Sequence, residues 1–135
     1  GRSIRQCAVL VRNLATSAMA ATQQLIDQYE AKLHNGGPPL DDHEDILESL
    51  KKLHAALGQL IRCASDESKI NQLPGLIGEA TSWAGRVKDD VTGDPMPLAI
   101  ATLIGAICIT FDLAATGGLA SAAALTYGRK SKSEL

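Results

Sequence analysis

The hydrophobic positions in the first quarter of the chain recur at helical spacing. Between residues 3 and 34 they are three or four residues apart, which is typical of helices that pack at a shallow angle. These positions are Ile4, Cys7, Val11, Leu14, Ala18, Ala21 and Leu25. The glycines and prolines of Asn35–Pro39 follow, and neither residue type continues a helix. The pattern therefore predicts one long amphipathic helix over residues 3–34.

Two further amphipathic helices are predicted over residues 42–64 and 72–91. Asp41 or Asp42 caps the first, whose apolar stripe lies on one face. The stripe consists of Ile46, Leu50, Leu53, Leu57, Leu60 and Ala64. Pro74 fits the first turn of the second helix, in which glycines lower the helix propensity. Its inward positions are Ile77, Ala80, Ala84, Val87 and Val91. The run Thr92–Pro97 then predicts a stop and a restart.

Residues 97–128 differ from the rest of the chain, because Asp112 is their only formal charge. Bulky apolar residues point in every direction around a helix of this sequence, so no polar stripe remains. Such a helix must be hidden from water by lipid, by the other helices or by a partner chain. Gly117 and Gly118 mark the place where the segment would reverse if it forms a hairpin. We expect Asp112 to face water or to cap a second short helix.

These patterns together predict an all-α fold. We expect a bundle of four to five helices in a single domain spanning residues 1–135. Its C-terminal part, residues 97–128, is a strongly hydrophobic helix or helical hairpin.

Two functions fit this hydrophobic segment. The first is a non-enzymatic helical module that contacts membranes through residues 97–128 and anchors, permeabilises or signals there. The alternative is a soluble protein–protein interaction or scaffold bundle, whose C-terminal helix is buried centrally or in an oligomer interface. The residues predicted to contact membrane or partner are Leu98, Ile100, Leu103, Ile104, Ile107, Phe111, Leu113, Arg129, Lys130 and Lys132. The residues predicted to allow close helix packing are Ala114, Gly118 and Ala122.

The net charge and the cysteine content of the chain limit its expected partners and its expected cellular compartment. The net charge is −2 and aromatic residues are few, so we expect no nucleic acid among the partners. The expected partners are membrane lipid, a partner helix or a second copy of the chain. The three cysteines, Cys7, Cys63 and Cys108, stand in apolar surroundings without a CxxC pair, which favours inert thiols in a reducing compartment. We expect a cytoplasmic, membrane-associated location.

Catalytic and metal-binding patterns are missing from the sequence. The three histidines, His34, His43 and His54, have no ligand spacing, and no GxSxG motif or phosphate-binding loop occurs. We therefore predict that the chain is not an enzyme and has no cofactor and no metal site. Trp83, the only tryptophan, fits either a core position or an anchor at a membrane or partner surface.

Overall fold

The structure is a computed structural model that describes residues 2–34, 41–91 and 93–116. Within this part the chain forms four α-helices, one short 3₁₀ helix and no strand. The elements are α1 (Arg2–His34), α2 (Asp41–Ala64), η1 (Glu67–Gln72), α3 (Leu73–Asp90) and α4 (Met96–Thr116). The all-helical prediction is confirmed. The course of the predicted hydrophobic segment after Thr116 lies outside the described residues.

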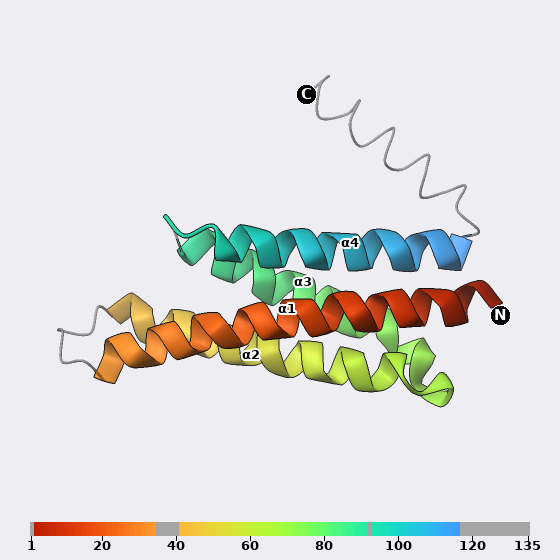
Figure 1. The fold of residues 1–135 in the computed structure, drawn as a ribbon, viewed down its shortest axis with the longest axis horizontal. Coiled ribbons are helices and arrows are strands. Elements are labelled where there is room, and N and C mark those ends of the chain that lie inside the picture. The colour runs from red at the N-terminus through yellow and green to blue at the C-terminus, as the bar shows by residue number, and fades with distance from the viewer. Residues whose placement is uncertain (1, 35–40, 92, 117–135) are drawn as a thin grey trace, which may run out of the picture.

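The four helices form an up-down-up-down bundle, in which consecutive helices run in opposite directions (Figure 1). α1 packs against α2 and α4, and α3 packs against the same two helices from the other side. This ring of neighbours is expected when short loops connect amphipathic helices. Each helix therefore has an inner face toward the core and an outer face toward solvent.

The core combines leucines of α2 with smaller residues of α1 and isoleucines of α4. Leu50, Leu53, Leu57 and Leu60 of α2 are fully buried, as its apolar stripe predicts. On α1, the seam contains alanines at its centre, and Thr22 is buried there with its hydroxyl donating to the Ala18 carbonyl at 2.7 Å. That bond removes the cost of burying the hydroxyl without a partner. The small side chains let α1 lie between α2 and α4.

Two short turns set the positions of α3 and α4. Asp66 caps η1, because its carboxylate accepts bonds from the Ser68 hydroxyl at 2.7 Å and from the Ser68 amide at 3.0 Å. These bonds lower the pKa of Asp66. Pro74 lies in the first turn of α3, where no amide donor is needed, as predicted. Gly93 adopts a φ of 84°, which a residue with a side chain rarely adopts, and reverses the chain before α4.

Candidate functional site

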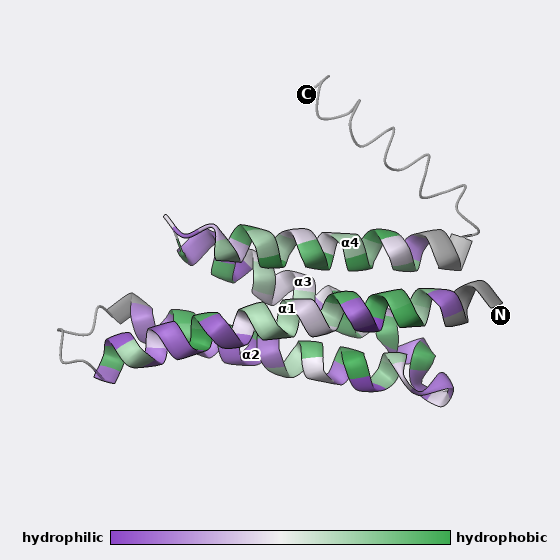
Figure 2. Ribbon diagram, viewed as in Figure 1, coloured by the Kyte–Doolittle hydropathy of each residue, from purple (hydrophilic) through white to green (hydrophobic). Residues whose placement is uncertain are grey.

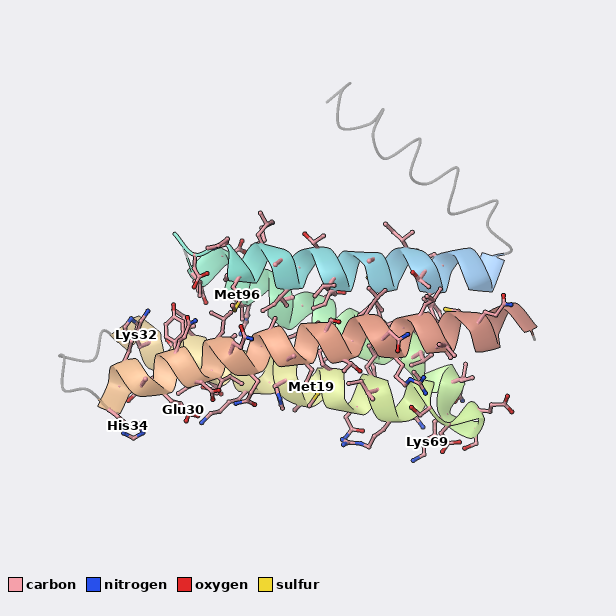
Figure 3. The ribbon with its side chains drawn as sticks, viewed as in Figure 1. Met19, Glu30, Lys32, His34, Lys69 and Met96 are labelled. Atoms are coloured by element: carbon pink, nitrogen blue, oxygen red, sulfur yellow. The ribbon has the colours of Figure 1, made fainter. Side chains whose placement is uncertain are left out.

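The inner face of α4 belongs to the bundle core. Ile100, Ile104 and Ile107 are buried against the other helices, with Leu103 and Phe111 partly buried beside them. Met96 lies on the side of α4 that faces the bundle (Figure 3). Five of the residues predicted to contact lipid or a partner are thus used, wholly or in part, by the chain's own core.

The outer face of α4 is uncharged and includes large aliphatic side chains. We define this outer face by Leu98, Thr102, Gly105 and Ile109, which follow one another at steps of four, three and four residues. Leu98 is 59% exposed and Ile109 is 40% exposed. The Thr102 hydroxyl donates to the Leu98 carbonyl at 2.9 Å, and a Cβ placed on Gly105 would meet no atom within 4 Å. The surface is consequently flat at its centre and apolar at both ends.

Two exposed aliphatic residues alone would be ordinary for a protein surface. The distinguishing feature of α4 is that no charged residue occurs from Met96 to Phe111, so its whole outer surface lacks charge over that length. Figure 2 shows the contrast, with α4 green and pale while purple residues recur along α1 and α2. Asp112, exposed near the end of α4, is the first charge that the helix presents.

The neighbouring helix α1 carries a further exposed aliphatic residue, Leu10. The Cys7 thiol donates to the Thr110 carbonyl of α4 at 3.5 Å, which places the N-terminal part of α1 beside the Ile109 end of α4. Leu10 lies one turn further along α1 and is 53% exposed. On the other side, Thr81 of α3 contacts Cys108 at 3.5 Å between Oγ1 and Sγ.

The second surface of interest is a cleft of about 400 Å³ between α2 and α3. Trp83 is half-buried there, with Lys52 Nζ 4.9 Å and Arg86 Cζ 5.2 Å from its ring centroid. The remaining lining residues are Asp45, Glu48, Ser49 and Asp90. Glu48 also pairs with Lys52 at 3.3 Å. Trp83 thus lies between the core and a polar cleft that contains three acidic and two basic side chains.

The three cysteines and His43 pack against neighbouring groups of the bundle. Cys7 and Cys63 are buried, Cys108 is half-buried, and all three are free. Burial raises the pKa of the Cys7 thiol, so the neutral form is favoured in the folded chain. His43 packs edge-on against Tyr29 with ring centroids 5.3 Å apart. Among the described residues, no group of three His, Cys, Asp or Glu side chains is placed to hold a metal ion.

The other residues predicted for membrane or partner contact, and those predicted for close helix packing, belong to the end of α4 and the chain beyond it. The side chains of Leu113 and Ala114, and the whole of Gly118, Ala122, Arg129, Lys130 and Lys132, lie outside the described residues. Within the described part, no helix has the length and apolarity needed to cross a membrane.

Three residues of the outer face of α4, and Leu10 of α1, are absent from the contact set that the sequence predicts. The three are Thr102, Gly105 and Ile109. Leu10 has a sequence signal, because it is a large apolar residue outside the apolar seam of its own helix. Thr102, Gly105 and Ile109 have no such signal in the sequence, because apolar residues cover all sides of α4.

Comparison of the chain with protein-family models, with curated proteins and with solved structures finds no match. The chemistry of the outer face of α4 is therefore the main basis for a functional inference.

Proposed function

We propose that the chain is a non-enzymatic interaction module that binds another protein through the outer face of α4. The observation that carries this proposal is the uncharged helix surface between two exposed aliphatic residues, Leu98 and Ile109. A protein surface of this kind loses little by being covered, because it contains no charge that must be desolvated. Covering the two aliphatic side chains is favourable in proportion to the apolar area removed from water.

Photo-crosslinking in cells that express the full chain tests this function. A photoreactive amino acid in place of Thr102 is expected to give discrete protein adducts, because Thr102 lies at the centre of the face. The matched control carries the same amino acid in place of Gln59, which is exposed on α2. Leu98→Glu combined with Ile109→Glu should abolish the Thr102 adducts. The proposal is wrong if position 102 gives no adduct, or gives the same adducts as position 59.

A second candidate function is membrane contact through residues 113–132. It is favoured by a specific feature of the sequence, the uncharged run from Leu113 to Gly128 followed by Arg129, Lys130 and Lys132. Basic residues beside an apolar segment suit an anionic membrane surface. This function leaves the buried isoleucines of α4 in the core and assigns lipid contact to the chain beyond it.

Flotation with anionic phospholipid vesicles tests the second candidate at mildly acidic and neutral pH. We expect the full chain to float with the vesicles, and a triple variant (Arg129→Glu, Lys130→Glu, Lys132→Glu) to stay at the bottom of the gradient. Neutral vesicles provide the lipid control. Absence of binding to anionic vesicles at both pH values would exclude this function.

A further inference from the structure

We propose that the protein covering the outer face of α4 is a second copy of this chain, packed antiparallel about a twofold axis. This rests on the proposed function, since it names the partner of the same face. The order of side-chain sizes along the face carries the proposal. That order is large, small, small, large: Leu98, Thr102, Gly105 and Ile109.

The order reads the same in both directions, with the steps four, three and four symmetric about their midpoint. In an antiparallel pair with the twofold axis at that midpoint, Leu98 lies opposite Ile109 of the second copy. Thr102 then lies opposite Gly105. A twofold interface requires a patch that is complementary to itself, so that residue i meets j and j meets i. On the outer face of α4, this arrangement places large residues opposite large ones and small residues opposite small ones.

The centre of the face permits the close approach that such a pair needs. Gly105 has open space above it, and the Thr102 hydroxyl is already bonded to its own helix. Ala101 and Ala106 flank the centre and are half-buried. Small residues at a crossing allow helix axes to approach to about 8 Å, the lower end of the usual range. The large residues then pack at the two ends, where they close the contact.

Charge also favours a second copy. Self-association places each surface on a duplicate of itself, so a charge near the twofold axis would face the same charge on the other chain. α4 carries no charge from Met96 to Phe111, and no such repulsion arises. The outer face of α2, in contrast, contains both Lys51 and Lys52 at adjacent exposed positions.

The size of the contact sets the expected strength. Leu98 and Ile109 are eleven residues apart, or about 16 Å along the helix axis. A contact of this length is smaller than a standard interface of about 1,200 Å² or more. We therefore expect a reversible monomer–dimer equilibrium.

Analytical ultracentrifugation of the full chain tests the dimer. The wild type should shift with rising concentration from the 14.2 kDa monomer toward twice that mass. Gly105→Gln should raise the dissociation constant at least about tenfold, since a buried pair of bulky polar side chains replaces the open centre. The monomer should stay folded by circular dichroism, because the Cβ meets no atom. Gly75→Gln is the matched control, since Gly75 also has open space but lies on α3.

Disulfide trapping tests the register. In a Cys108→Ser background, a mixture of Leu98→Cys and Ile109→Cys chains should form a covalent dimer on mild oxidation. Each variant alone should not, because identical positions would be about 16 Å apart along the axis, beyond the ~7 Å reach of a disulfide between Cα atoms. Efficient crosslinking of Leu98→Cys with itself would overturn the antiparallel arrangement.

The experiments distinguish failure of the proposed dimer from failure of the proposed interaction function. A wild type that stays monomeric at every concentration overturns the second copy as partner, and so does a Gly105→Gln variant that dimerises like the wild type. Adducts from position 102 with a different protein would still support the interaction function in that case. Absence of any adduct from position 102 removes both.

Discussion

α2 and α4 are similar in length and lie on opposite sides of α1 and α3, yet their outer faces differ in chemistry. Both helices bury an aliphatic stripe, with leucines on α2 and isoleucines on α4. On its outer face α2 carries Glu48, Lys51 and Lys52, whereas α4 carries no charge before Asp112. The inner faces explain why the chain folds as a bundle. The difference between the outer faces is independent of that packing, and the proposed binding face rests on it.

The largest expected effect on the free energy of unfolding comes from truncating a buried residue on the inner face of α2 or of α4. Leu57→Ala on α2 and Ile107→Ala on α4 each remove a side chain that is buried in the core. Each should lower the free energy of unfolding by about 3 kcal/mol, measured by urea denaturation, because a cavity remains. If Ile107→Ala left the unfolding free energy unchanged, the inner face of α4 would not pack in the core of the bundle in solution.

Removal of Trp83 should have the next largest effect. The indole is only half-buried, but it packs between α2 and α3 beneath Lys52 and Arg86. Trp83→Ala should reduce the free energy of unfolding by about 2 kcal/mol, less than for a fully buried tryptophan. Trp83→Phe serves as the control and should lose less than half as much. Equal losses for both would show that the ring's size, and not its presence, matters most.

Glycine replacement should stabilise both helices. A Cβ on Gly105 of α4 meets no atom within 4 Å, and a Cβ on Gly58 of α2 lies 3.5 Å from Met19 Cε, an ordinary contact. Met19 of α1 is at the α2 side of its helix (Figure 3). Gly105→Ala and Gly58→Ala should each raise the unfolding free energy by about 0.5–1 kcal/mol, measured at low protein concentration. A loss at Gly58 alone would mean that α1 and α2 are closer than described.

The smallest effect is expected at the charged outer face of α2. Lys51 pairs with Glu30 of α1 at 3.6 Å, with both side chains well exposed. Lys51→Met should change the unfolding free energy by less than about 0.5 kcal/mol, and by still less at high salt. A change several times larger would assign the charges of α2 a role in holding the bundle together.

The sequence predicted the helices where one face differs from the other. The expected ranges 3–34 and 42–64 match α1 and α2 to within one residue. α3 begins at Leu73, as Pro74 indicates, and η1 lies in the break between the predicted ranges 42–64 and 72–91. Confirmed positions such as Leu50 and Leu57 belong to stripes with a clear helical period.

The orientation of α4 could not be predicted in the same way. Its apolar residues cover all sides, so no periodicity separates Ile104, which is buried, from Ile109, which is exposed. Only the packing of α4 against α1 and α3 decides which side faces inward. The residues of the proposed binding face on α4 therefore could be identified only from the structure, whereas the absence of charge along α4 is evident from the sequence.

The place of Trp83 has a consequence for how unfolding of this protein can be observed. Its indole is the only one in the chain and reports on the contact between α2 and α3. Detachment of α4 from the bundle would leave that contact in place, and the intrinsic emission would barely change. A thermal melt followed by Trp83 fluorescence would then record a single transition, although α4 had already separated from the bundle. A second reporter on α4, such as a dye on Cys108, is needed to resolve the two events.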